Sequence, residues 1–198
     1  MTAPPANLLP AATPLPGDAA VERLLDRLID HRPLILTAAM DAPTAARFEA
    51  LRRRWFPPRR NLVPAHITLF HQLPGSEFDG VVGRLRMLAR TLPPPLVEVT
   101  GLRSLGGGVA YKLQSPELEA LHAELVSGFG PLLTLQDRQG YRPHLTIQNK
   151  VTAAVARATL ADLEATFVPF KFRVMGVAVW RYLGGPWEAL KTVTLRGK

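Results

Sequence analysis

The chain of 198 residues contains no cysteine. This absence excludes disulfide bonds, zinc sites built on thiolates and cysteine nucleophiles. The sequence also lacks any apolar run approaching the roughly 20 residues of a membrane span, and its N-terminus has neither the basic start nor the apolar centre of a signal peptide. We therefore expect a soluble cytoplasmic protein.

Acidic residues are also scarce, with 16 Asp and Glu against 24 Lys and Arg, which gives a formal net charge of +8. Such a charge attracts polyanions before specific contacts form, so nucleic acid is the leading candidate partner. Most of the cations are arginine, whose planar guanidinium suits phosphate. A compositional bias towards Arg, Ala and Pro would produce the same charge, so the charge supports this interpretation without establishing it.

Residues 1–17 are rich in proline and alanine and nearly free of charge, which predicts a disordered N-terminal tail. Residues 18–198 are expected to form one domain, since a hydrophobic content of 47% is enough for a core. Asp18 is a good N-cap for a first helix, predicted over Ala19–His31 from apolar residues at helical spacing.

After Pro33 the apolar patterns and the Pro and Gly breaks predict an alternation of strands and helices. The predicted strands are Leu34–Met40, AHITLF from Ala65, Leu96–Leu105, Val109–Gln114, RPHLTIQNK from Arg142, Phe170–Leu183 and Trp187–Leu195. The predicted helices are Asp41–Trp55, about Glu77–Thr91, Pro116–Phe129 and Thr152–Thr166.

The order of elements occurs twice, and a shift of 78 positions tests this repeat. The shift places matching residues on each other in two separate blocks: His66 on His144, Thr68 on Thr146, Arg103 on Arg181 and Leu105-Gly106-Gly107 on Leu183-Gly184-Gly185. We infer a duplication with repeats at about 33–108 and 109–195. It predicts an α+β fold, bilobal and pseudo-twofold, in which two antiparallel sheets line a central groove and helices cover the outer faces. Such a domain is self-sufficient, so we expect a monomer.

The candidate chemistry lies in two His-x-Thr motifs, His66 with Thr68 and His144 with Thr146. In a strand, residues i and i+2 share a face, so each histidine should project beside its threonine. Two opposed imidazoles can supply the base and the acid that phosphodiester cleavage requires, and threonine hydroxyls can donate to phosphate oxygens. One such motif alone would be explained by the preference of strands for threonine, but two equivalent copies indicate a catalytic site.

The residues HITL at 66–69 and HLTI at 144–147 resemble the paired motifs of the 2H phosphoesterase superfamily, particularly the bacterial 2′-5′ RNA ligases or RNA cyclic phosphodiesterases. The resemblance covers about Leu34 to Leu195. It implies hydrolysis of 2′,3′-cyclic phosphates on RNA ends or cyclic nucleotides, usually to 2′-phosphates, without metal or cofactor, and in some members reversible 2′-5′ ligation. It also implies that His144 activates water, that His66 protonates the leaving oxygen and that the two threonines hold the phosphate.

Four further residues are candidates for substrate binding. Many members of that family carry a basic residue two positions after the motif threonine, where this chain has Phe70 and Gln148. Phe70 could stack on a base or belong to the core. Arg103 and Arg181 could clamp phosphate beside the predicted hairpin turns or be solvated strand ends. A cluster at Arg52–Arg54, Arg59 and Arg60 could bind nucleic acid or complement the end of its helix.

Two other functions remain open. The chain could be a catalytically silent RNA-binding module with the same fold and a strongly salt-dependent affinity. It could also be a metal hydrolase, but zinc requires three protein ligands and no carboxylate has a suitable spacing from either histidine. Resistance of the activity to a chelator would separate this last possibility from the two-histidine mechanism.

Overall fold

The computed structural model describes residues 30–197. The predicted tail over residues 1–17 lies outside the described residues, as does nearly all of the helix predicted over Ala19–His31. We describe the compact unit that begins at His31 by itself. Within the described residues, no helix is long and apolar enough to cross a membrane.

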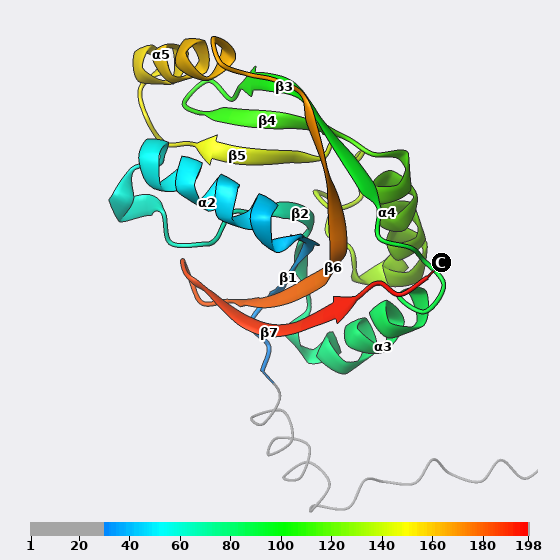
Figure 1. Ribbon diagram of the computed structural model, residues 1–198. Coiled ribbons are helices and arrows are strands. Elements are labelled where there is room, and N and C mark those ends of the chain that lie inside the picture. Colours follow the sequence, from blue (N-terminus) through cyan, green and yellow to red (C-terminus); the bar gives the residue numbers. More distant parts are fainter. Residues whose placement is uncertain (1–29, 198) are drawn as a thin grey trace, which may run out of the picture. The chain divides into compact units, whose positions relative to one another are not determined.

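The unit contains seven strands and four α-helices, arranged as in Figure 1. The strands are β1 (Leu34–Met40), β2 (Ile67–Leu73), β3 (Leu96–Ser104), β4 (Val109–Gln114), β5 (His144–Gln148), β6 (Phe170–Tyr182) and β7 (Trp187–Thr194). The helices are α2 (Ala42–Trp55), α3 (Phe78–Leu88), α4 (Pro116–Phe129) and α5 (Ala153–Glu164). Short 3-10 turns cover Pro58–Arg60, Gly75–Glu77 and Gly130–Leu132. The α+β class and the order of elements agree with the sequence prediction.

All strand pairs are antiparallel, as predicted, but they form one connected sheet instead of two. The order is β2-β1-β6-β3-β4-β5, and β7 also pairs with β6. The cause is the length of β6: its 13 residues pair with β3 over 170–173 and with β1 and β7 farther along. One continuous strand therefore belongs to both groups of strands (Figure 1).

The sequence repeats are interleaved in space. The group β2-β1-β6-β7 takes two strands from each repeat, and β3 of the first repeat pairs with β4 of the second. The helices α2 and α4 also pack against strands of the other repeat. Phe48 of α2 packs against Tyr111 of β4, whereas Phe129 of α4 packs against Phe70 of β2. Each of these helices thus covers strands of the other repeat.

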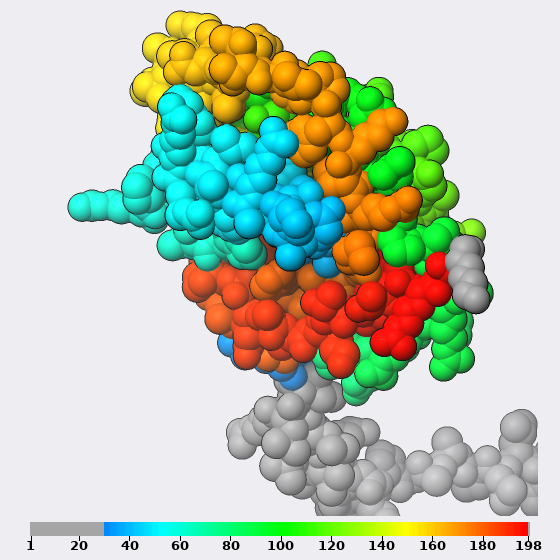
Figure 2. All heavy atoms as spheres, in the orientation of Figure 1, coloured from blue at the N-terminus to red at the C-terminus, as the bar shows by residue number. Residues whose placement is uncertain are grey.

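The two equivalent helices begin in the same way. The side chain of Asp41 accepts a hydrogen bond from the backbone N–H of Thr44 at the start of α2, and Ser115 accepts one from Leu118 at the start of α4. A proline lies in the first turn of each helix, where no N–H is needed. In Figure 2, α2 and the loop after it form a large part of the visible face, beside atoms of β6 and β7.

A β-bulge interrupts each motif strand at the same place. Thr37 of β1 lies opposite Thr68, but the preceding Leu36 lies opposite Phe70, so Leu69 is an extra residue. In β5, Ala110 lies opposite Thr146 and Val109 lies opposite Gln148, so Ile147 is the extra residue. The residues opposite the bulges are adjacent in the partner strands, and adjacent residues of a strand face opposite sides of the sheet. Each bulge therefore turns the residue after it away from the face that carries the motif threonine.

The hairpin turns recur with the same spacing of 78. The backbone N–H of Leu105 donates to the carbonyl of Gly108, and that of Leu183 donates to Pro186. Gly106 and Gly184 both have positive φ, of 77° and 85°, which glycine adopts without steric cost. The repeated Leu-Gly-Gly block in the sequence therefore corresponds to a repeated turn.

Candidate functional site

The imidazoles of both motifs are held by the same local contact. Nδ1 of His66 lies 2.7 Å from the carbonyl oxygen of Pro64, and Nδ1 of His144 lies 3.0 Å from that of Arg142. A carbonyl can only accept, so each Nδ1 carries the proton and Nε2 of the neutral ring is left as the proton acceptor. The backbone two residues before each motif thus sets the same tautomer at both histidines.

The threonines lie on one face of the sheet. Thr68 is opposite Thr37 in β1, and Thr37 is opposite Ala178 in β6. In the other group, Thr146 is opposite Ala110 in β4. The register also places His144 opposite Lys112, two residues from Ala110, so His144 and Thr146 share a face as predicted.

Aromatic residues surround the first histidine. The ring of His66 lies 4.6 Å from that of Trp187, which in turn neighbours Trp180 at 6.1 Å. The indole N–H of Trp180 donates to the hydroxyl of Thr37 at 2.8 Å, which fixes this wall. Burial lowers the pKa of His66 from 6.5 to about 4, and the nearby Arg52 and His144 act in the same direction. His66 is therefore neutral over most of the physiological range.

The second histidine lies among polar and cationic groups. Burial lowers the pKa of His144 below 6.5, with a smaller contribution from Arg103, and His144 is the less deeply buried of the two histidines. Among the described residues, the Nε of Arg103 and the hydroxyl of Tyr141 are buried and have no hydrogen-bond partner. Both residues line the same cavity as His144.

This cavity has a volume of about 290 Å³. Its lining comes from β2, β3, α4, β5 and the segment before β5, and the residues that matter here are Thr68, His71, Arg103, Tyr141, Arg142 and His144. His66 and Thr146 are not among the lining residues, although the positive charge of His144 reaches His66. A larger hollow of about 440 Å³ contains Glu98, Glu117 and Glu119, and its carboxylates would repel an anionic substrate.

Arg52 is the charged residue that links the two motifs, and the sequence analysis treated it only as part of a surface patch. It is 1% exposed, and its guanidinium donates to the carbonyl of Thr146 at 2.9 Å. It also donates to Asn61 and to the carbonyl of Val63, in the segment that leads to His66. Arg52 therefore ties the approach to the first motif to the strand of the second.

In regular strands Phe70 and Gln148 would continue the faces of the motif threonines, but the bulges reverse their direction. Phe70 is fully buried and stacks on His122 of α4 at 4.8 Å. Gln148 is 2% exposed and donates to the hydroxyl of Thr159 and to the carbonyl of Trp55. Neither side chain lines the cavity.

The two arginines paired by the repeat are separated by the fold. Arg103 lies opposite Ala110, on the face of Thr146, and lines the cavity. Arg181 lies three residues beyond Ala178 in β6, where the pairing with β1 is regular. Its side chain therefore projects from the opposite face of the sheet, where it forms an ion pair with Glu188 at 2.9 Å. The structure therefore brings Arg103, but not Arg181, to the cavity.

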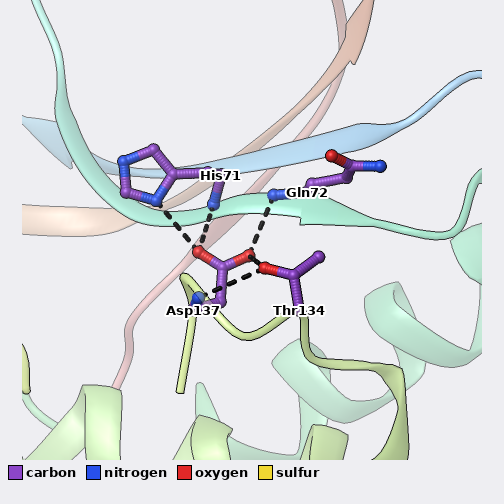
Figure 3. A network of polar contacts seen from close by, with 4 residues as sticks. All are labelled: His71, Gln72, Thr134 and Asp137. Carbon is purple, nitrogen blue, oxygen red and sulfur yellow. Dashed lines mark hydrogen bonds and ion pairs between the residues drawn. The ribbon is translucent and has the colours of Figure 1, made fainter. Parts of the chain in front are cut away.

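No motif in the sequence points to His71, yet the structure places it at the cavity. Asp137 accepts hydrogen bonds from the Nδ1 of His71 at 2.9 Å and from its backbone N–H at 2.8 Å. The backbone N–H of Gln72 and the hydroxyl of Thr134 also donate to this carboxylate (Figure 3). Nothing in the local sequence indicates this pair, because 66 positions separate its members.

Comparison with known proteins gives the same fold. A Thermus thermophilus protein, TT0787, superposes with a TM-score of 0.59 at 20% identity, and Escherichia coli LigT complexed with 3′-AMP does so at 0.58 and 17%. A protein described as a phosphoesterase gives 0.54 and 20%. Each alignment covers 84% of this chain and 99% of the other. No curated protein matches the sequence.

The fold is thus the one found in LigT and in the protein described as a phosphoesterase. The model of the 2′-5′ RNA ligase superfamily matches residues 40–186, a range that includes both motifs. The chain belongs to this superfamily, which confirms the resemblance drawn from HITL and HLTI.

Proposed function

We propose that the protein hydrolyses 2′,3′-cyclic phosphates at RNA ends, or on related nucleotides, through His66, Thr68, His144 and Thr146 and without a metal. The observation that carries the proposal is the duplicated histidine geometry. Each ring is fixed through Nδ1 by the carbonyl two residues before it, which leaves Nε2 for proton transfer. A core or surface histidine would need no such duplicated arrangement.

Charge and the solved relatives support a nucleotide phosphate as ligand. The cavity is lined by Arg103, Arg142, His71 and His144, and its one carboxylate, that of Asp137, is already hydrogen-bonded by four donors. Escherichia coli LigT has been crystallised with 3′-AMP and with NADP⁺. These compounds share a phosphate attached to a ribose, which is the class of ligand that we assign to the cavity.

The proposed reaction needs one base and one acid. The base takes a proton from water, the water oxygen forms a bond to phosphorus, and the bond from phosphorus to the ribose 3′ oxygen breaks. The acid gives its proton to that oxygen, so a 2′-phosphate and a 3′-hydroxyl result. Hydroxyls of Thr68 and Thr146, together with Arg103, donate to the phosphate oxygens as charge develops. The same sequence of steps, with the 5′-hydroxyl of another RNA in place of water, would join RNA ends through a 2′-5′ bond.

Burial favours His66 as the base and His144 as the acid, the reverse of the roles implied by the family resemblance. Because a positive charge on His144 lowers the pKa of His66, the two rings share one proton more readily than they hold two. The more deeply buried His66 gives up its proton first, since its pKa is about 4. A bound phosphate then stabilises the proton on His144.

The test is hydrolysis of a 2′,3′-cyclic-phosphate-terminated oligoribonucleotide in the presence of a chelator, with the native protein, His66→Ala and His144→Ala. Each substitution should reduce kcat by about 10²- to 10⁴-fold, the usual contribution of a positioned acid or base. Circular dichroism and thermal unfolding serve as controls for folding. If the native protein binds the oligonucleotide but turns over none of it, the proposal is overturned and the silent RNA-binding function replaces it.

A further inference from the structure

The cavity contains more phosphate-binding groups than one cyclic phosphate can use. The two motif histidines and threonines, with Arg103, suffice for the reacting group, yet Arg142 and His71 also line the hollow. Of these two, His71 has the more constrained position. Its side chain is half exposed, whereas that of Asp137, which holds it, is 1% exposed.

The position of His71 is built by the fold. The buried carboxylate of Asp137 takes the Nδ1 proton of the ring and also the backbone N–H groups of His71 and Gln72. Burial raises the pKa of Asp137, but the hydrogen bonds from His71 and Gln72 more than offset this, so the carboxyl stays below its ordinary pKa and remains ionised. Figure 3 shows that the other ring nitrogen, Nε2, points away from this carboxylate.

The ring is also close to the reacting groups without belonging to either motif. A positive charge on His71 lowers the pKa of both His66 and His144, so its ring lies within electrostatic reach of both. The pairing of β2 with β1 shifts a second time between Phe70 and Leu73. His71 lies in this irregular stretch, beyond the strand positions that orient Thr68. His71 is thus displaced along the strand from the position where the reacting phosphate would be held.

We propose that Nε2 of His71 binds the phosphate that precedes the terminal nucleotide, so that the site selects RNA ends over nucleoside cyclic monophosphates. This inference rests on the proposed function, because the reacting phosphate must lie between the two motifs. It adds a second phosphate subsite beside them, with Asp137 as the positioning residue that orients the ring. The substrate class is then a ribonucleotide with a 2′,3′-cyclic phosphate and a 5′-phosphate.

Two substitutions separate binding from support of the loop. In His71→Asn the side-chain NH₂ takes the place of Nδ1–H and keeps the bond to Asp137, but nothing replaces Nε2. In His71→Gln the NH₂ lies near the position of Nε2 and can donate to phosphate. Arg157→Gln on α5 removes an exposed charge elsewhere and serves as the control for net charge. Thermal unfolding of all three variants checks the fold.

The experiment compares adenosine 2′,3′-cyclic phosphate with its 5′-phosphorylated form. We expect His71→Asn to raise KM about tenfold for the 5′-phosphorylated substrate only, the effect of losing one hydrogen bond to a charged group, with kcat unchanged. His71→Gln should recover part of this loss, and Arg157→Gln should behave as the native protein.

Equal effects of His71→Asn on both substrates, or no effect on either, would overturn the second subsite. If the native protein turns over neither compound, the proposed function fails. Dissociation constants of the same two compounds for the native protein and His71→Asn then test the subsite by themselves. A tenfold weakening confined to the 5′-phosphorylated compound would uphold it, and identical constants would refute it.

Discussion

The two histidine motifs have the same backbone and different surroundings. Both rings are fixed by a carbonyl two residues earlier, and a bulge follows both threonines. The first ring, however, packs against Trp187, whereas the second lies with Arg103 and Tyr141 at the cavity. The repeated backbone sets where each proton-accepting nitrogen lies, and the surroundings determine how strongly it holds a proton.

This difference suggests how a duplicated protein acquires two chemical roles. Identical environments would give two histidines with equal proton affinity, and neither would be preferred as acid or base. Burial lowers the pKa of His66 to about 4, and it lowers the pKa of His144 less strongly. In the proposed mechanism, this asymmetry in packing divides the roles of base and acid between the motifs.

The largest expected effect comes from changing the leaving group. An aryl ester such as bis(4-nitrophenyl) phosphate leaves without protonation, so the loss of the general acid matters little for it. We expect His66→Ala to lose about 10²- to 10⁴-fold in kcat/KM on both this ester and the cyclic phosphate. His144→Ala should lose as much on the cyclic phosphate but less than about tenfold on the aryl ester. The opposite pattern would exchange the two roles.

A second comparison concerns the residues after the bulges. Phe70→Ala removes a fully buried ring that stacks on His122 and should reduce the free energy of unfolding by about 3–5 kcal/mol. Gln148→Ala removes a buried hydrogen bond to Thr159 and should cost about 1–3 kcal/mol. Urea unfolding monitored by tryptophan fluorescence measures both. A stable Phe70→Ala variant that had lost RNA binding would restore the stacking role considered for this residue.

The smallest effect should follow from exposing His66. Trp187→Ala opens one wall around the ring, so the pKa of His66 should rise from about 4 towards 6.5, while that of His144 changes less. A base must be deprotonated, so the acid limb of the profile of kcat/KM against pH should move to higher pH. NMR titration of the histidine ring signals gives both pKa values. An unmoved His66 would show that Trp187 does not cause its burial.

The sequence predicted the elements well because proline and glycine mark their ends. Helix α4 begins at Pro116 and ends at Phe129, before Gly130, as expected. The bulges were not predicted, since simple alternation places Phe70 beside Thr68. Two adjacent apolar residues, Leu69 and Phe70, were the available signal, because a regular strand with one polar face would alternate.

The sequence revealed the two motifs but not the residues around them that depend on distant contacts. The motif residues repeat locally, so a shift along the chain finds them. The pair His71–Asp137 and the buried Arg52 depend on contacts between distant segments, which no local pattern reports. Arg181 shows the converse limit: the repeat matched it to Arg103, but its position along β6 directs it to the other face.

The continuous strand β6 has a consequence for motion. It is hydrogen-bonded to β1 and β7 at one end and to β3 at the other, so bending between the two groups of strands would break a ladder in the middle of the sheet. The strands of both histidine motifs therefore belong to one connected sheet. The segment before β5 lines the cavity, and Asp137 fastens it to β2. The hydrogen bonds of one carboxylate thus hold part of the cavity wall against the strand that carries the first motif.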